Sequence, residues 1–353
     1  MIPGAIPTTR RPAFDFNQRP LVVIWEVTRA CALACRHCRA EANPSRNPLE
    51  LSFEEGCRLM DQVRELDPAV FVLTGGDPFM RKDLAELTRY GTSIGLRISG
   101  SPSGTRLANL KNMQKCADAG MQRVAFSLDH ADEAAHDAFR GVQGSYRWTM
   151  EGIEAAKAAG LEIQIGTTVT RYNKETLPAI AAKVAELGVS LWSVFFLIPT
   201  GRGQLSDMLT PAEHEEVMIW LAEYSRTATF PIKSTEGPHW RRILLERGIT
   251  GLPTMGVNDG KGFAFISHVG DVHPSGFLPW TAGNVKTESL VEIYRHSEIF
   301  RLLRDPSQLK GRCGACEYRE ICGGSRARAY GVYGDWLAED PACGYVPPGY
   351  KPE

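Results

Sequence analysis

The sequence predicts an α/β fold in which six β–α units in a row form a parallel sheet with helices outside it. Residues 20–225 alternate short runs rich in β-branched and aromatic residues with longer runs of helical periodicity. Strands that alternate with helices in this way pair in parallel and carry their helices on the faces of the sheet. The chain has 353 residues, 43% of them hydrophobic, which is enough for one large domain and a smaller one.

Six strands are expected in order, at residues 21–26, 70–74, 96–100, 123–128, 162–170 and 191–198. Helices are expected between and after them. Ser52 and Glu55 form a capping box that opens the first helix, and Pro211 stands at a first-turn position of the last. Ligands of parallel α/β folds bind at the carboxyl ends of the strands, so the loops that follow the strands are where functional residues are expected.

The alternation ends after residue 225. Residues 226–262 are rich in proline and glycine and are expected to be a linker with one short helix at 240–247. Residues 263–345 are expected to hold a hairpin that turns at Gly270-Asp271, a helix at 289–303 and a cysteine-rich region. The predicted division is an N-terminal segment 1–19, a barrel 20–225, the linker 226–262, a small domain 263–345 and a Pro-rich tail 346–353.

Composition excludes several classes of function. The net charge of −1 argues against an electrostatically driven binder of nucleic acid or of a membrane surface. No apolar stretch is long enough to span a bilayer, and the N-terminus lacks the apolar core of a signal peptide. We therefore expect a cytoplasmic protein with no nucleic-acid or membrane partner. In that compartment the nine cysteines indicate metal ligands rather than disulfides.

Cys31, Cys35 and Cys38 directly follow the first predicted strand. Their C-x3-C-x2-C spacing supplies three thiolates, whereas a cubane iron–sulfur cluster has four irons, so one iron stays open for another ligand. Zinc is the alternative, but it prefers four ligands and no fourth cysteine follows nearby. Cys57 and Cys116 stand alone in helix-like segments, where a cysteine is usually a small buried hydrophobe.

The triplet and its position after a strand resemble the radical S-adenosylmethionine (radical SAM) enzymes, whose fold is a partial (β/α)6 TIM-like barrel. The resemblance implies that Cys31, Cys35 and Cys38 are catalytic and hold a 4Fe–4S cluster whose open iron chelates SAM. An electron from that cluster then cleaves SAM to a 5′-deoxyadenosyl radical, which abstracts hydrogen from the substrate. It also implies a reducing partner such as flavodoxin or ferredoxin.

Other segments match SAM-binding parts of the same family. Thr74-Gly75-Gly76-Asp77-Pro78, after the second strand, resembles the family's Gly-Gly-Glu-Pro segment, which hydrogen-bonds the SAM amino group. Asp77 stands where glutamate is common. Ordinary turns and helix caps are the alternative reading of such small polar residues. The resemblance implies further cofactor contacts within the triplet and at later strand ends, namely His37, Ser101, Ser103, Ser127, Asp129 and Thr167.

A second cysteine group lies near the C-terminus. Cys313, Cys316, Cys322 and Cys343 give four thiolates, a closed site that structural zinc would also accept. The group resembles the SPASM or twitch extension of radical SAM enzymes, where four such cysteines hold an auxiliary 4Fe–4S cluster. Full SPASM domains carry one more cluster, but Ser275 and Arg326 stand where two of its cysteines are expected. We therefore expect two 4Fe–4S clusters in total.

Several segments of the C-terminal third are more distinctive. Residues 276–285, 322–330 and 338–343 resemble the radical SAM proteins of haem d1 formation and of the alternative route from sirohaem to haem, as do 136–145 and 233–242. The resemblance implies a tetrapyrrole or similar carboxylated substrate whose side chains are decarboxylated, removed or oxidised. Ser325 departs from the Gly-Gly-Cys that is frequent in that group.

Three arginines are candidates for pairing with the carboxylates of such a substrate. Arg241, Arg242 and Arg326 could bind carboxylates in bidentate fashion, and solvated surface charges are the alternative interpretation.

Two other functions remain open. Many SPASM-type proteins mature ribosomally made peptides, often with an N-terminal leader-binding domain, and only about twenty residues precede the first strand here, so that domain is expected to be a separate chain. The other alternative is an iron–sulfur electron carrier or scaffold. A carrier has no use for an open iron, which favours an enzyme.

Overall fold

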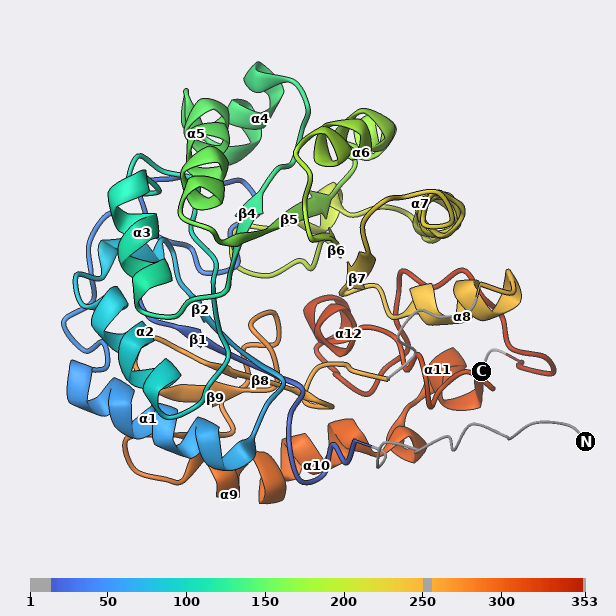
Figure 1. Ribbon diagram of the computed structural model, residues 1–353. Helices are drawn as coiled ribbons and strands as arrows, with labels where there is room; N and C mark the ends of the chain where they lie inside the picture. Colours follow the sequence, from blue (N-terminus) through green and yellow to red (C-terminus); the bar gives the residue numbers. More distant parts are fainter. Residues whose placement is uncertain (1–13, 250–255, 352–353) are drawn as a thin grey trace, which may run out of the picture.

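The computed structural model describes residues 14–249 and 256–351. Most of the predicted N-terminal segment, part of the predicted linker and the end of the tail lie outside these ranges. One sheet of ten strands runs in the order β10-β9-β8-β1-β2-β3-β4-β5-β6-β7. The sheet curves, and helices α1 to α7 lie along its outer side (Figure 1).

The strands from β8 through β1 to β7 pair in parallel, while β9 and β10 are antiparallel. The six predicted strands of residues 20–225 are confirmed within about three residues at each end. The strands are β1 (Val22–Glu26), β2 (Val70–Thr74), β3 (Ile98–Gly100), β4 (Arg123–Ser127), β5 (Glu162–Val169), β6 (Leu191–Phe196), β7 (Ile232–Thr235), β8 (Phe263–Ile266), β9 (Asp271–His273) and β10 (Gly283–Asn284).

Helices follow most strands of the barrel and cover the small domain. They are α1 (Phe53–Leu66), α2 (Leu84–Ser93), α3 (Leu110–Asp118), α4 (Glu133–Arg140), α5 (Ser145–Ala158), α6 (Leu177–Glu186), α7 (Pro211–Tyr224), α8 (His239–Glu246), α9 (Leu290–His296), α10 (Glu298–Arg304), α11 (Gly311–Ala315) and α12 (Arg326–Tyr333). Short 3-10 helices are η1 (Pro78–Met80), η2 (Lys174–Thr176), η3 (Leu205–Asp207) and η4 (Pro306–Gln308).

Two expectations need correction. Residues 226–262 contain the predicted short helix, α8, but also strand β7, which pairs with β6 along Trp192↔Ile232 to Phe195↔Thr235. The strand β7 is only four residues long, and the proline and glycine that flank it made the segment look like part of a linker. The helix expected at 289–303 is two helices, because Ser297 adopts an extended backbone with ψ of 144° between α9 and α10.

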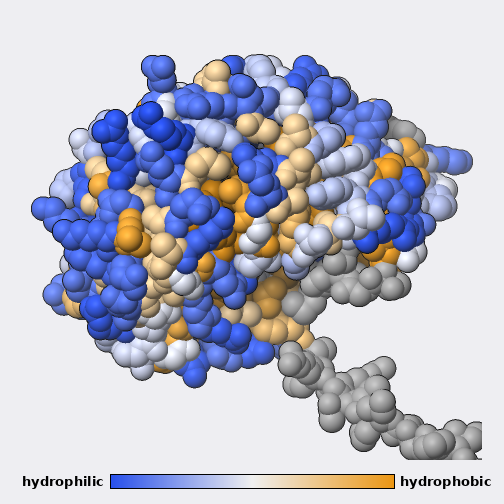
Figure 2. Space-filling model, turned by 45° about the horizontal axis from the view of Figure 1, so that its top comes forward, coloured by the Kyte–Doolittle hydropathy of each residue, from blue (hydrophilic) through white to orange (hydrophobic). Residues whose placement is uncertain are grey.

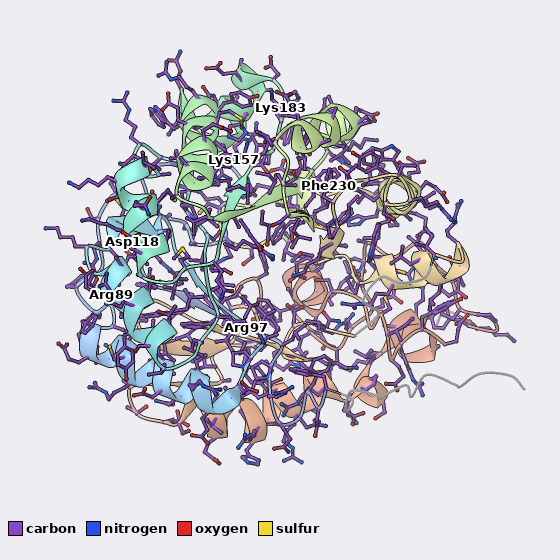
Figure 3. All side chains as sticks on the ribbon, viewed as in Figure 1. Arg89, Arg97, Asp118, Lys157, Lys183 and Phe230 are labelled. Atoms are coloured by element: carbon purple, nitrogen blue, oxygen red, sulfur yellow. The ribbon has the colours of Figure 1, made fainter. Side chains whose placement is uncertain are left out.

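Alternate residues of each strand face the helices or the inside of the barrel. In β1, Val23 and Trp25 are fully buried on the helix side, where a Cβ on Gly56 of α1 would lie 2.6 Å from the Trp25 ring. The outer helices turn their charges to solvent, as Arg89 of α2 and Lys157 of α5 do (Figure 3). Hydrophobic residues gather toward the middle of the face in Figure 2, with hydrophilic residues around them.

Both lone cysteines lie in helices. Cys116 of α3 is 2% exposed within the main core, and Cys57 of α1 is half-buried beside it. The part of the chain that is described contains no helix that combines the length and the apolarity needed to cross a bilayer.

The capping box that opens α1 provides a test of the fold. Ser52 Oγ accepts from Glu55 N–H at 3.1 Å, and the Glu55 carboxylate accepts from Ser52 N–H at 2.8 Å. Ser52→Ala should lower the free energy of unfolding by about 1 kcal/mol, because it leaves a helix-terminal N–H without its acceptor. Denaturant titration of the reconstituted protein measures the loss. Ser206→Ala, at an exposed position, is the matched control, and equal stability of the two variants would contradict the assignment.

Candidate active site

The cysteine triplet lies in the loop between β1 and α1, at the carboxyl end of a strand that has parallel neighbours on both sides. Cys31 and Cys35 are buried in a small cluster with Leu33, and Cys38 packs against it. Backbone N–H groups donate to two of the sulfurs, from Leu33 to Cys31 at 3.3 Å and from Ala42 to Cys38 at 3.5 Å. Amides aimed at sulfur stabilise the thiolate ligands of iron–sulfur clusters, so this donor set fits a cluster with one open iron.

Arg140, at the end of α4, supplies positive charge beside the triplet. Burial would lower the pKa of this buried guanidinium, but the negative charges of Cys35, Asp129 and the other two thiolates raise it. Burial also raises the pKa of the Cys35 thiol to about 11, so the thiolate form depends on a nearby cation or metal. Sequence analysis does not single out Arg140, because an arginine at a helix end is ordinarily exposed and its burial here is decided by tertiary packing.

Asp129 and His37, both predicted to contact SAM, lie next to Arg140. Asp129 Oδ2 lies 3.2 Å from Arg140 Nη1, and its Oδ1 accepts from Thr168 N–H at 2.8 Å. The His37 ring stacks on Phe139 with centroids 4.5 Å apart, and its Nε2 lies 3.5 Å from Arg140 Nη1. Burial lowers the pKa of His37 to about 4, so the imidazole is neutral.

The glycine turn after β2 is joined to the triplet loop through the backbone. Gly76 N–H donates to the Thr28 carbonyl at 2.8 Å, and Asp77 N–H donates to the Ala30 carbonyl at 2.7 Å. A Cβ on Gly76 would lie 2.5 Å from the Ala30 oxygen, and one on Gly75 would lie 2.6 Å from that of Thr28. Both positions therefore require glycine for the turn and the loop to be in contact, whether or not a ligand binds there.

The carboxylate of Asp77 already has partners within the protein. Its Oδ1 accepts from Phe79 N–H at 3.1 Å, which caps the short helix η1 that begins at Pro78, and its Oδ2 accepts from Thr105 Oγ1 at 2.6 Å. Burial raises the pKa of Asp77. Its side chain therefore orients the turn.

Four other predicted SAM contacts lie at the same end of the sheet. Thr74 and Ser127 are the last residues of β2 and β4 and alternate with residues that face the helices, so they face the inside of the barrel. Ser101 follows β3, and Ser103 Oγ donates to the Gly76 carbonyl. Ser103 thereby ties a third loop to the glycine turn.

Thr167 is not on this side of the sheet. It is fully buried on the face toward the helices, where its hydroxyl donates to the Leu128 carbonyl at 2.7 Å and accepts from Trp192 Nε1 at 2.9 Å. Its neighbour Thr168 faces inward instead. The sequence could not distinguish the two, because both residues are threonine and a shift of one residue changes the face.

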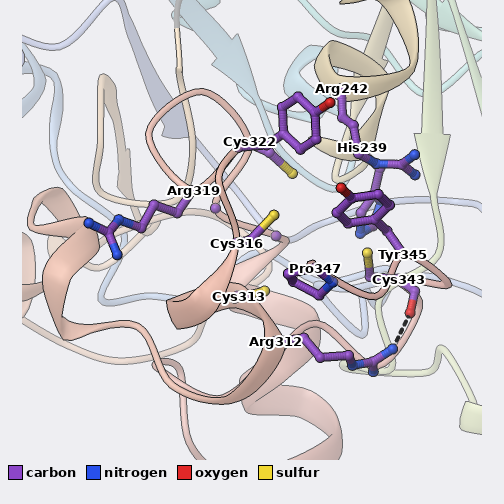
Figure 4. A pocket seen from close by; sticks show the side chains of 13 residues that line it. His239, Arg242, Arg312, Cys313, Cys316, Arg319, Cys322, Cys343, Tyr345 and Pro347 are labelled. Carbon is purple, nitrogen blue, oxygen red and sulfur yellow. Dashed lines mark hydrogen bonds between the residues drawn. The ribbon is translucent and has the colours of Figure 1, made fainter. Parts of the chain in front are cut away.

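The second cysteine group surrounds a pocket in the small domain. Figure 4 shows the sulfurs of Cys313, Cys316, Cys322 and Cys343 pointing toward one another from the wall of that pocket. Cys313 Sγ accepts from Asp340 N–H at 3.3 Å. Four thiols that converge with an amide donor fit a fully ligated cluster. Within residues 14–249 and 256–351, no three His, Cys, Asp or Glu side chains lie close enough together to hold a single metal ion, whereas the thiolates of a 4Fe–4S cluster each bind a different iron and lie farther apart.

His239 and Asp340 tune the thiol of Cys343. His239 Nε2 lies 3.2 Å from Asp340 Oδ2. Burial opposes protonation, but the charges of Asp340 and Cys343 raise the pKa of His239 to about 9. Burial likewise opposes ionisation of Cys343, yet the His239 imidazolium and its hydrogen bond lower the pKa of this thiol. The pocket thus favours a thiolate at this position.

Neither residue that replaces an expected cysteine points into that pocket as a ligand. Arg326 is 1% exposed, and its Nη1 donates to the carbonyls of Trp336 and Ala338 at 3.0 and 2.6 Å. Ser275 is 3% exposed, and its Oγ accepts from Phe277 N–H at 3.2 Å. Ser275 serves the packing of the small domain, whereas Arg326 also donates from Nη2 to Cys313 Sγ at 3.6 Å and so supports the cysteine group.

The sequence predicts that Arg241, Arg242 and Arg326 either bind substrate carboxylates or are solvated surface charges. In the structure all three are instead paired within the protein. Arg242 is paired with Glu215 at 2.5 Å and Glu246 at 2.8 Å. Arg241 donates to the Ile321 and Val257 carbonyls at 3.0 and 2.6 Å. Arg241 and Arg326 thus hold loops of the small domain in place, and Arg242 ties α8 to α7. Sequence does not reveal these uses of arginine.

One loop connects the two cysteine groups. The segment after β6 lies against the triplet, since Arg202 N–H donates to the Cys38 carbonyl at 3.0 Å. A Cβ on Gly331 of α12 would lie 3.1 Å from the Pro199 carbonyl oxygen in the same segment. The helix that follows the second cysteine group therefore packs on the loop that touches the first.

Comparison with known proteins agrees with this arrangement. The radical SAM superfamily matches residues 25–184. The AdoMet-dependent heme synthase of Nitratidesulfovibrio vulgaris is 42% identical over 360 residues, 98% of each chain. That of Methanosarcina barkeri is 39% identical, over 93% of this chain and 97% of its own. The mycofactocin maturase of Mycolicibacterium smegmatis is 30% identical, over 92% of this chain and 82% of its own.

Among solved structures, Streptococcus suis SuiB bound to S-adenosylmethionine has the same fold. The TM-score is 0.73 at 16% identity, over 93% of this chain and 78% of that chain. The similarity in sequence to the heme synthases spans both cysteine groups and the loop between them. The chain therefore belongs to the radical SAM superfamily, in the family that contains these heme synthases.

Proposed function

We propose that this radical SAM enzyme oxidises propionate side chains of an iron porphyrin to vinyl groups, with Fe-coproporphyrin III as substrate and haem as product. The observation that carries the proposal is the 42% identity to an AdoMet-dependent heme synthase over 98% of both chains. Haem differs from Fe-coproporphyrin III only in two vinyl groups that replace two propionates. The maturase of a peptide is a more distant relative, at 30% identity.

This reaction requires a radical that abstracts hydrogen and an acceptor for one electron. When bound, SAM and the first cluster supply the 5′-deoxyadenosyl radical, and the second cluster supplies an electron acceptor. When a propionate side chain has lost a hydrogen atom from its ring-side carbon, the bond between its other methylene carbon and the carboxylate carbon breaks. This step leaves a vinyl group and CO2 and gives up one electron. The first electron would come from a partner such as a flavodoxin or ferredoxin.

The residues of this chain would divide that work. Cys31, Cys35 and Cys38 would hold the SAM cluster, with Arg140 offsetting the negative charge of the thiolates. Cys313, Cys316, Cys322 and Cys343 would ligate one auxiliary cluster completely, so that it leaves no iron for the substrate.

Aromatic side chains on the inside of the barrel support a flat, apolar ligand. Phe195 of β6 lies 6.4 Å from Phe277, between ring centroids, and a Cβ on Gly276 would lie 3.1 Å from Phe265 of β8. Arg39 stacks on Phe265 with its guanidinium 4.4 Å from the ring centroid, and its charge is paired with Glu26 at 3.0 Å. The half-buried rings of Phe195 and Phe277 would contact a porphyrin face, while Arg39 covers Phe265.

The triplet is tested by removing its three thiols together. The variant with Cys31, Cys35 and Cys38 all changed to alanine should form no 5′-deoxyadenosine, because SAM has no iron to chelate. It should retain about four irons at the other site. Anaerobic reconstitution, iron analysis and chromatography of SAM products measure both. SAM cleavage at the wild-type rate would refute the ligand assignment.

The number of clusters is tested by iron content. The reconstituted wild type should bind about eight irons, two cubanes' worth. Ser275→Ala should bind the same amount, since that hydroxyl already accepts a backbone hydrogen bond. Cys322→Ala, the matched change at a predicted ligand, should lose about four. A wild-type value near twelve irons would mean that a further ligand set exists.

The substrate is tested by product analysis. Reduced enzyme with SAM and Fe-coproporphyrin III should give haem, with one CO2 and one 5′-deoxyadenosine for each vinyl group formed. Turnover of a short precursor peptide instead, with no change in the porphyrin, would favour the maturase alternative.

A further inference from the structure

A polar row crosses the inner wall of the barrel at β5, β6 and β7. Strand register places Gly166, Ser193 and Lys233 side by side. Their neighbours Trp192 and Ile232 are buried on the opposite face of the sheet, where the Trp192 ring meets Tyr224 of α7. Successive side chains of a strand alternate between faces, so Ser193 and Lys233 point into the barrel.

Lys233 is a cation without a counter-charge. Among residues 14–249 and 256–351 it makes no ion pair or hydrogen bond. The side chain is exposed, and the pKa of the ammonium is lowered, first by partial desolvation and then by the positive charge of Arg241 nearby. By contrast, Glu26, at the inner end of β1, is paired with Arg29 and Arg39 at 3.0 Å each.

Ser193 adds a hydroxyl without a partner beside that cation. It is 1% exposed, and its Oγ has no hydrogen-bond partner in the described ranges. The next inward hydroxyl on β7, Thr235 Oγ1, is also buried without one. Buried polar groups are normally paired, so each such atom calls for an explanation, and a bound ligand is one.

The aromatic surface lies directly beside this polar row. Phe195 is the next inward residue after Ser193 on β6, and a Cβ on Gly166 would lie 3.4 Å from the Phe195 ring. A cation, a hydroxyl and an aromatic face in contact suit a flat apolar ligand that carries an anionic group at its edge.

We propose that Lys233 and Ser193 together bind one substrate carboxylate inside the barrel and thereby fix the rotational position of the ring. The inference rests on the proposed function, because it takes a carboxylated porphyrin as the ligand. The ammonium and the hydroxyl donate to the carboxylate, and the ring lies on Phe195. The propionate whose carboxylate is bound here is not decarboxylated, while a different propionate side chain faces the radical.

The test compares two ligands on the reconstituted enzyme. Fe-coproporphyrin III carries four carboxylates, and its tetramethyl ester has the same ring without their charge. Lys233→Met should weaken binding of the acid about tenfold, because a charged hydrogen bond is lost. Binding of the ester should not change. Lys233→Arg should restore most of the affinity for the acid, and Ser193→Ala should weaken it about threefold.

Absorbance titration of the porphyrin measures each dissociation constant, and iron content confirms that every variant is loaded. Lys157→Met is the matched control, because Lys157 lies on α5 outside the barrel, and it should leave both affinities unchanged (Figure 3). Wild-type affinity of Lys233→Met and of Ser193→Ala for the acid would overturn the inference. An equal loss for acid and ester would overturn it as well, by indicating a structural role for Lys233.

These results are separable from failure of the proposed function. If the wild type converts Fe-coproporphyrin III and the Lys233 variants bind it normally, only the carboxylate site is wrong. If the wild type neither binds nor converts the porphyrin, the proposed function fails, and the carboxylate site fails with it.

Discussion

The close contact between the glycine turn after β2 and the cysteine loop after β1 is the constraint on which the rest of the site depends. Gly76 N–H and Asp77 N–H donate to two carbonyls of that loop, and no side chain fits between the two backbones. The contact fixes the loop at the carboxyl edge of the sheet. Asp77 and Ser103 then hold the turn through Thr105 and the Gly76 carbonyl. The segment that resembles a SAM-binding motif is thus first a support for the cysteine loop.

The cysteines of both groups are wholly or partly buried, and burial disfavours thiolates unless positive charge or metal is close. At the triplet that charge is Arg140, held by Asp129. At the second group His239 lowers the pKa of Cys343, and Asp340 holds the imidazole in its charged form. In each case a carboxylate orients a cation toward sulfur. The same arrangement occurs on unrelated elements because, at both sites, a thiolate must be stabilised in a partly desolvated environment.

The interior of the barrel carries a cation and hydroxyl groups that have no protein partner in the described ranges. Arg39 and Glu26 satisfy each other near the triplet, whereas Lys233 and Ser193 face the interior without protein partners in the described ranges. Aromatic rings from β6, β8 and the segment after β9 occupy the space between. The loop after β6 links Cys38 to α12 and so lies between the two cysteine groups. The two cysteine groups therefore lie on either side of this loop.

The sequence by itself determined the parallel α/β architecture and the seven metal-binding candidates, because both are encoded locally. Strand and helix periodicity extends over many residues, and cysteine spacing is written directly in the chain. Tertiary structure decided the rest. It placed Thr167 on the wrong face for a ligand, buried Arg326 and Arg242 as structural donors, and gave Arg140 its place beside the thiols. It also made a strand of residues 232–235, a segment too short to be recognised between proline and glycine until it pairs with β6. The direction and burial of a side chain depend on neighbours distant in sequence, and no local pattern specifies them.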